Sequence, residues 1–284
     1  MKKNRLLSAL LAGALCVSLA ACGGTNAADS AASSDASSSQ DAEPVELTVF
    51  AAASMTETLN EIAELYKVEA PNVSIVYNFD SSGTLKTQIQ EGAVCDLFLS
   101  AGQKQMDQLD AAADASVNTE GLDFVLSDSR LDLLENKVVL IVPEGAENGI
   151  TSFEDAGTDK VSRIALGGAD VPVGQYAQEI YEYLGLWEDM NAAGKITFGT
   201  NVKEVVSQVE AAAVDCGVVY KTDVAAAQGV EVVAEAPEGS CSPAIYPVAV
   251  LKTSEHQAEA QAFLDFLQTD ACTAIFEKAG FDVL

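Results

Sequence analysis

Hydroxyl-bearing residues follow two strand-like runs of the sequence, at points where helical patterns begin. Ser54 follows the run 48–50 and stands three residues before Glu57, which is the spacing of a capping box. Ser81 and Ser82 follow the run 76–79, and Leu85 then starts a short helical pattern. A hydroxyl beside the unpaired N–H groups of a helix N-terminus can bind an anion. These two positions therefore indicate neutral donors suited to an oxyanion.

Two further helix starts follow strand-like runs later in the chain. Pro172 follows the run 164–166 and suits the first position of a helix, where its missing N–H costs nothing. Asn201 follows the run 196–198 and, with Glu204 three residues on, is typical of a helix cap. A single capped helix is ordinary structure. In open α/β sheets, however, ligands bind beyond the carboxyl ends of strands, so four such starts together predict one anion site.

Tyr220 ends the apolar run 217–220, and a hydroxyl there could point into a cleft or could belong to a half-buried packing residue. The chain offers little for catalysis. Its one histidine, His256, lies in a polar stretch, and there is no GxSxG elbow and no cluster with metal-ligand spacing. Paired acids arise by chance among 43 acidic residues. We therefore expect a protein that is not an enzyme and needs no cofactor.

The formal net charge of −28 argues against nucleic acid as a partner, because phosphates require Lys and Arg. It does not exclude an anionic ligand. Hydroxyls and N–H groups can satisfy the oxygens of a tetrahedral dianion without a lysine. Salt also screens repulsion by the acidic surface over about 8–10 Å.

Short β-rich runs alternate with helical patterns through the rest of the chain, which predicts an α/β fold. The expected strands are residues 46–50, 74–79, 95–100, 137–142, 163–166, 195–198, 216–220, 230–233 and 244–251. The run 138–142 is apolar on both faces, which favours mostly parallel sheets covered by helices on both sides. A body of roughly 240 residues suits two lobes better than one core.

The N-terminus has the pattern of an export signal. Three basic residues precede a short apolar run that ends in Leu19-Ala20-Ala21-Cys22, which resembles a lipobox. Residues 1–21 are therefore predicted to be a lipoprotein signal peptide, with Cys22 lipidated and anchoring the protein to the cell membrane. Residues 22–43 are rich in Ala, Ser, Asp and Gly and are expected to form a flexible tether.

Four cysteines remain for the folded body: Cys95, Cys216, Cys241 and Cys272. In an exported protein they could form two disulfides in any of three pairings, or remain four small buried side chains. No CxxC pair occurs among them, which argues against a zinc site.

Several segments together resemble the periplasmic molybdate-binding proteins of ABC importers. They are TVFAAASMTETL at 48–59, FDSSGTLKTQI at 79–89, CDLFLSAGQKQMD at 95–107, VPVGQYA at 171–177, GVVYKTDV at 217–224, YPVAV at 246–250 and AIFEKAGF at 274–281. The AAAS, SSGT and VPxGxYA segments are specific only in combination. The resemblance spans nearly the whole body in the right order.

This resemblance implies a two-lobed periplasmic-binding-protein fold that closes on one oxyanion, molybdate or tungstate, in a cleft between the lobes. With the sequence pattern, it places one lobe at residues 44–137 plus 245–284 and the other at 138–244. The ligand shell that it implies comprises the hydroxyls of Ser54, Ser82 and Tyr220 and the backbone N–H groups of Val173 and Val202. Gly83 and Lys203 stand where the family can have serine and arginine, and Gly83 leaves the serine register open.

The partners implied are the permease subunits of an ABC importer, and we expect an extracytoplasmic monomer. Sulfate, phosphate or a small organic anion are alternative ligands, because the sequence does not reveal the volume of the cleft. A ligand-sensing domain of a transcriptional regulator is disfavoured by the export signal and by the lack of a preceding DNA-binding helix pair.

Overall fold

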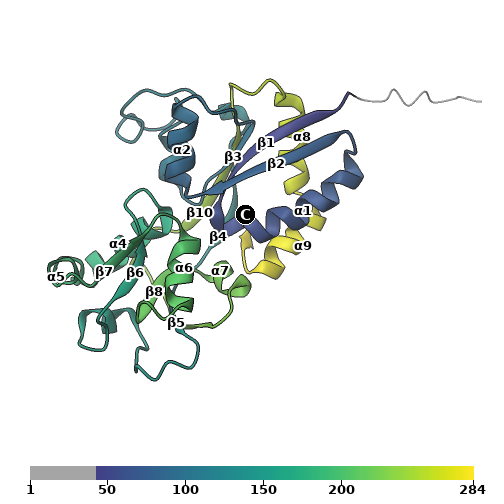
Figure 1. Cartoon of the computed structure of the whole chain (residues 1–284). Coiled ribbons are helices and arrows are strands. Elements are labelled where there is room, and N and C mark those ends of the chain that lie inside the picture. Colours follow the sequence, from purple (N-terminus) through teal and green to yellow (C-terminus); the bar gives the residue numbers. More distant parts are fainter. Residues whose placement is uncertain (1–42) are drawn as a thin grey trace, which may run out of the picture. The chain divides into compact units, whose positions relative to one another are not determined.

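Two β-sheets with helices packed against them organise a computed structural model that describes residues 43–284 (Figure 1). The first sheet has six strands, in the order β11-β4-β10-β3-β1-β2. They are β1 (Val45–Ala52), β2 (Val73–Asp80), β3 (Leu97–Leu99), β4 (Leu131–Asn136), β10 (Ala244–Val250) and β11 (Asp282–Val283). The second sheet has five strands, in the order β7-β6-β8-β5-β9. They are β5 (Val138–Pro143), β6 (Ile164–Gly167), β7 (Ile196–Gly199), β8 (Cys216–Tyr220) and β9 (Val230–Glu235).

The two-lobed α/β fold is confirmed, but both sheets are mixed rather than mostly parallel. Strands β2, β1 and β3 run parallel, and so do β7, β6 and β8, whereas β10, β4, β11, β5 and β9 each pair antiparallel with their neighbours. The cause lies in the two connections between the sheets. Strand β4 leads into β5 with only Lys137 between them, and β10 brings the chain back after β9. Neighbouring strands that leave and re-enter a sheet must run in opposite directions.

Helices cover both faces of the first sheet. They are α1 (Thr56–Glu69), α2 (Ser82–Gln90), α3 (Gln103–Asp107), α8 (Gln257–Leu267) and α9 (Asp270–Ala279). On one face, Leu47 and Val49 pack in the same buried cluster as side chains of α1, α8 and α9. On the other, Phe50 and Phe98 pack with side chains of α2 and α3. Alternate residues of β1 thus face opposite layers, which explains why the second half of this strand, residues 49–52, is apolar without alternation.

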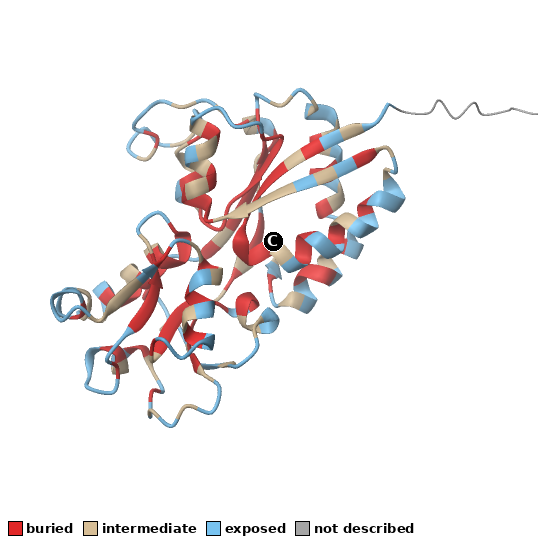
Figure 2. Ribbon diagram, viewed as in Figure 1, coloured by how far each residue is buried: buried red, intermediate tan, exposed pale blue. Residues whose placement is uncertain are grey.

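The second sheet is packed mainly by the amphipathic helices α4 (Pro172–Tyr183) and α6 (Val202–Glu210), with α5 (Trp187–Ala192) and α7 (Lys221–Ala226) beside them. Val205 and Val209 of α6 are fully buried, and the polar residues of the same helix face outward (Figure 2). Short 3₁₀ turns complete the described elements, at Ala53–Met55, Ser127–Ser129 and Phe153–Gly157.

All nine strands expected from the sequence are present, within a few residues at their ends. Strands β4 and β11 were missed. The β4 segment mixes acidic and apolar residues without strict alternation, and β11 has only two residues. Both lie at one edge of the first sheet, where β4 is the neighbour of β10.

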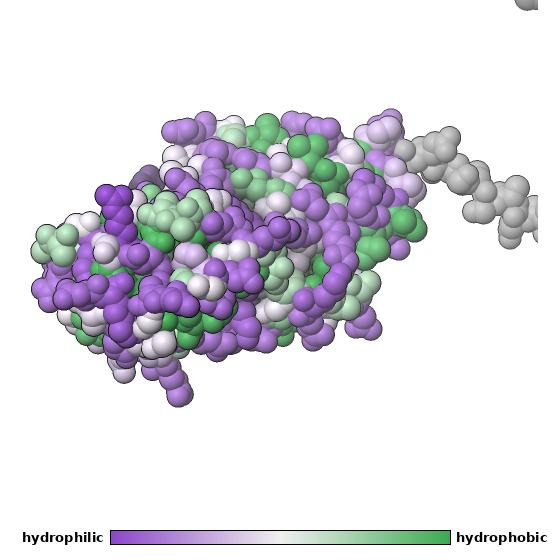
Figure 3. Space-filling view, turned by 60° about the horizontal axis from the view of Figure 1, so that its bottom comes forward, coloured by the Kyte–Doolittle hydropathy of each residue, from purple (hydrophilic) through white to green (hydrophobic). Residues whose placement is uncertain are grey.

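The predicted signal peptide, the predicted lipidation site Cys22 and nearly all of the predicted tether lie outside the described residues. Within residues 43–284, no helix combines the length and apolar character needed to cross a bilayer. One face of this body exposes hydrophilic side chains over most of its area, with hydrophobic atoms in separate patches (Figure 3).

Candidate functional site

The four helix starts singled out in the sequence come together where the two sheets face each other. The start of α2 lies against the loop before α4, because a Cβ added to Gly83 would fall 2.0 Å from the backbone oxygen of Asp170. The start of α6 lies against the end of β2, where Asn201 Nδ2 donates to Asp80 Oδ1 at 3.3 Å. Elements from both sheets therefore enclose one region.

Ser54 lies in the 3₁₀ turn before α1, and only 4% of its surface is exposed. The predicted capping box of Ser54 with Glu57 is wrong. Helix α1 starts at Thr56, with Met55 at the cap position and no side-chain cap. The tight turn directs the Ser54 hydroxyl across to Tyr246 of β10, whose Oη lies 2.9 Å away.

Tyr246 and Asn136 were not identified as site residues from the sequence. Asn136, the last residue of β4, donates from Nδ2 to Tyr246 Oη at 3.2 Å and to Thr222 Oγ1 at 2.8 Å. Because Tyr246 Oη already accepts a hydrogen bond from Asn136, the Tyr246 hydroxyl can donate a hydrogen bond to Ser54 Oγ. The Ser54 hydroxyl proton is then left free to donate to a ligand. The YPVAV segment could have pointed to Tyr246; Asn136 lies on a strand that the sequence did not reveal.

Ser82 is fully buried at the first position of α2, and its Oγ accepts a hydrogen bond from the backbone N–H of Ala101 at 2.9 Å. Ser81, rather than Ser82, caps the helix by accepting from Thr84 N at 3.2 Å. With its acceptor role filled by Ala101, the Ser82 hydroxyl has a proton to donate. With Tyr246 as the donor to Ser54, the two serines are prepared in the same way, each accepting one bond from the protein.

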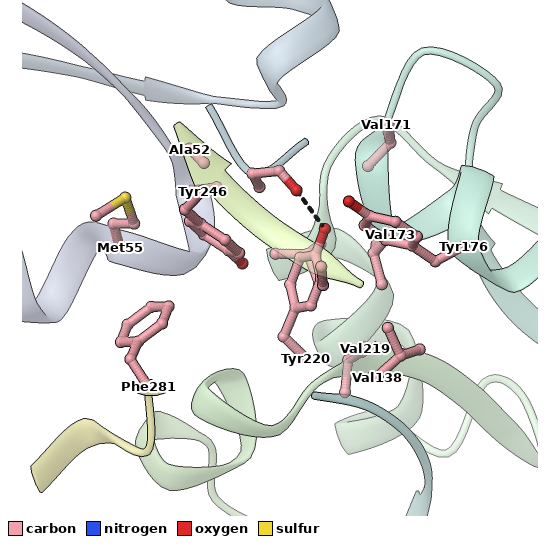
Figure 4. Packing of buried hydrophobic residues seen from close by; sticks show 14 of the residues in the cluster. Ala52, Met55, Val138, Val171, Val173, Tyr176, Val219, Tyr220, Tyr246 and Phe281 are labelled. Atoms are coloured by element: carbon pink, nitrogen blue, oxygen red, sulfur yellow. Dashed lines mark hydrogen bonds between the residues drawn. The ribbon is translucent and has the colours of Figure 1, made fainter. Parts of the chain in front are cut away.

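Tyr220 ends β8 and is 1% exposed. Its hydroxyl donates to the backbone oxygen of Ala101 at 3.3 Å, which links the second sheet to the residue that orients Ser82. Figure 4 shows this bond as the dashed line, with Tyr176 and Tyr246 beside the Tyr220 ring. The Tyr220 and Tyr246 rings meet edge to face, with centroids 5.6 Å apart. Burial raises the pKa of both hydroxyls well above the ordinary value, so both remain protonated donors.

Val173 and Val202 occupy the first turns of α4 and α6, after Pro172 and Asn201. First-turn N–H groups have no acceptor within their own helix. Asn201 caps α6 as predicted, since its side chain accepts from Glu204 N at 3.1 Å. Both valine side chains are at least 96% buried, so only their backbone can offer a polar group.

The five residues predicted to hold the ligand are therefore all at most 4% exposed and are placed on facing elements of the two sheets. Ser82 and Tyr220 are linked through Ala101, and Ser54 bonds to Tyr246, which is not a member of the predicted set. Such a set of neutral donors in a dry environment is suited to a small, fully deprotonated oxyanion. Over residues 43–284, no group of three or more His, Cys, Asp or Glu side chains could hold a metal ion.

One ion cluster lies beside this region. Lys203 Nζ of α6 lies 2.9 Å from Glu57 Oε2 and 3.6 Å from Oδ1 of the buried Asp223. Burial raises the pKa of Asp223 to about 7, against the opposing effects of Lys203 and of the bond that its Oδ2 accepts from Tyr220 N.

The cysteines of the body are four free thiols rather than two disulfides, and the expectation of small buried side chains holds for three of them. Cys95, Cys216 and Cys272 are buried and Cys241 is partly exposed. Burial raises the pKa of Cys216 to about 12 and that of Cys241 to about 11, which keeps both thiols protonated.

Comparison with known proteins shows relatives over nearly the whole described body. A family model described as bacterial extracellular solute-binding protein matches residues 47–282. A candidate ABC transporter substrate-binding lipoprotein, YvgL of Bacillus subtilis, is 37% identical over 88% of this chain and 91% of its own length. The molybdate-binding protein ModA of Haemophilus influenzae is 34% identical over 84% of this chain and 91% of its own. The solved substrate-binding domain of a candidate molybdenum ABC transporter from Clostridium difficile is 38% identical, covers 84% of this chain and 99% of its own, and superposes with a TM-score of 0.62.

Proposed function

Because this chain belongs to the family of bacterial extracellular solute-binding proteins, we propose that it captures molybdate or tungstate and delivers it to the permease of an ABC importer. The observation that carries the proposal is the pair of buried serines: Ser82 accepts a hydrogen bond from Ala101 N–H, and Ser54 is bonded to Tyr246. With Tyr246 as the donor, each serine has a proton to give to a ligand. The names of the relatives, a molybdate-binding protein and a molybdenum transporter domain, support the choice of ligand.

The proposed ligand shell consists of the hydroxyls of Ser54, Ser82 and Tyr220 and the N–H groups of Val173 and Val202. Neutral donors favour an oxyanion that carries no proton at neutral pH, because every oxygen of the ligand must then accept. The weak 3.3 Å bond from Tyr220 to the Ala101 carbonyl would give way to a stronger, charge-assisted bond to the ligand.

Capture is proposed to couple to closure of two lobes, residues 44–137 plus 245–284 and residues 138–244. Each lobe supplies part of the shell: the serines come from one, and Val173, Val202 and Tyr220 from the other. A ligand shifts the equilibrium between open and closed forms only as far as it binds the closed form better. The permease would then recognise the closed form.

The protein is proposed to act as an extracytoplasmic monomer tethered through a lipidated Cys22, and to bind its ligand without chemical turnover. A lipoprotein among the relatives supports the anchor. Mass spectrometry of the protein extracted from membranes would test it, because lipidation at Cys22 predicts removal of residues 1–21 and a diacylglycerol-bearing N-terminal cysteine.

Isothermal titration calorimetry with molybdate, tungstate, sulfate and phosphate tests the proposed ligand. We expect saturable one-to-one binding of molybdate and tungstate, and much weaker binding of sulfate and of phosphate, which carries a proton at neutral pH. Saturable binding of sulfate or phosphate alone would reassign the ligand within the same class of protein. Absence of binding by all four anions would contradict an oxyanion site and favour a small organic anion.

A further inference from the structure

Three charged side chains meet where the start of α6 approaches the start of α1, and none of them belongs to the proposed ligand shell. Lys203 Nζ donates to both carboxylate oxygens of Glu57, at 2.9 and 3.1 Å. Glu57 lies in the first turn of α1, beside the first sheet, and Lys203 lies in the first turn of α6, beside the second. This ion pair therefore joins the two halves of the molecule.

Beneath the pair lies Asp223 of α7, which is 1% exposed. Its Oδ2 accepts from the backbone N–H of Tyr220 at 3.2 Å, while Oδ1 is buried without a hydrogen-bond partner in the described part of the chain. The ammonium of Lys203, 3.6 Å from Oδ1, is the cation that faces this carboxylate. A buried carboxylate without a compensating charge is unfavourable, so Asp223 gains from keeping Lys203 in place.

We propose that Lys203 is a positioning residue that holds the closed form of the protein, by bridging Glu57 across the lobes and compensating Asp223, which fixes the backbone of Tyr220. This inference rests on the proposed function, because it assigns a role to residues around the same site. Lys203 touches no member of the ligand shell through its side chain; it acts through the position of α6 against α1 and through Asp223 on Tyr220.

This role has a kinetic signature. The bridge to Glu57 can form only once the lobes have closed, after the anion has arrived. Lys203 should therefore slow dissociation of the ligand and leave association nearly unchanged. A lysine that merely attracts the anion through its charge would instead speed association, in a manner that weakens as salt is added.

The chain supplies a matched control whose glutamate partner lies on the same helix as Glu57. Lys278 of α9 pairs with Glu61 of α1 at 3.3 Å, so it also bridges to an α1 glutamate, but between two helices that pack on the same sheet. Its side chain is 73% exposed, against 32% for Lys203. Lys278→Met removes an equivalent charge from the protein without removing a contact across the lobes.

The test is stopped-flow binding of molybdate to the mature protein, with the association and dissociation rate constants taken from the concentration dependence of the observed rate. Lys203→Met should raise the dissociation rate constant on the order of tenfold, between the effects of an exposed and a buried ion pair. Lys203→Arg should restore most of the slow dissociation, and Lys278→Met should leave both rate constants as in wild type. Adding Glu57→Gln to Lys203→Met should cause little further change, since the shared contact is already lost.

Urea unfolding of the unliganded variants confirms that each is folded before its kinetics are compared. An unchanged dissociation rate in a folded Lys203→Met variant overturns the inference, and so does a slower, salt-sensitive association alone. A wild-type protein that binds none of the oxyanions contradicts the proposed function instead, so the two failures are distinguishable.

Discussion

Replacement of Ser82 by alanine tests the proposed site at the residue whose surroundings define its role most fully. The hydroxyl of Ser82 is buried, accepts from the N–H of Ala101 at 2.9 Å and has its proton free. The substitution removes a donor to the buried anion and also leaves the N–H of Ala101 without its acceptor. It should therefore affect binding and folding separately.

The lost bond to a charged ligand should weaken binding by about 1–3 kcal/mol, or roughly 5- to 150-fold in the dissociation constant. The orphaned Ala101 N–H should lower the free energy of unfolding of the ligand-free protein by about 1–3 kcal/mol. Ser81→Ala is the matched control, because Ser81 caps the same helix from the preceding position. It should lower the free energy of unfolding by about 0.5–2 kcal/mol and leave the affinity unchanged.

Calorimetric titration with molybdate gives the affinities, and urea unfolding without ligand gives the stabilities. A Ser82→Ala variant with wild-type affinity would refute the assigned shell. If Ser81→Ala weakens binding and Ser82→Ala does not, Ser81 rather than Ser82 donates to the ligand. The sequence left this choice open because Gly83 stands where the family can have a serine.

Three further predictions follow from contacts described above. Gly83→Ala should prevent full closure of the lobes, because the added Cβ would fall 2.0 Å from the Asp170 backbone oxygen. The affinity for molybdate should drop sharply. The radius of gyration from small-angle scattering should no longer decrease when molybdate is added. Burial raises the pKa of Asp223 to about 7, so the folded protein binds that proton more tightly than the unfolded chain does. The free energy of unfolding should therefore fall as pH rises from about 4 to about 7. In urea unfolding, the Asp223→Asn variant should lose less stability than wild type over this range. Ellman's reagent should react with Cys241 in the folded protein, slowly because its raised pKa leaves little thiolate, and with the three buried thiols of the body only after unfolding. Equal reactivity of all four in the folded protein would contradict their burial.

The sequence predicted the α/β layers because apolar periodicity and helix-start chemistry are local signals. Nine of the eleven described strands, Pro172 at the first position of α4 and the cap at Asn201 could all be recognised in this way. The expectation of mostly parallel sheets failed for a non-local reason. Strand direction depends on how β4 and β10 pass between the two sheets, and no local pattern encodes that path.

The predicted ligand residues came from resemblance, and the structure adds the groups that orient them. Tyr246 and Ala101 contact the two serines from positions at least 19 residues away in the chain, and Asn136 contacts Tyr246 in turn. Such contacts have no spacing signature, and Ala101 contributes only its backbone. The capping box at Ser54 failed because the hydroxyl bonds to Tyr246, a tertiary partner that competes with the local backbone.

The bonds that orient Ser54 and Ser82 all come from elements of the first sheet: β4 and β10 for Ser54, and the segment after β3 for Ser82. They do not depend on the second sheet, so they would persist when the lobes part. An arriving anion would then meet hydroxyl groups that are already oriented for binding, so little conformational entropy would be lost in ordering them. The first lobe would recognise the ligand, and the second would determine how long it stays.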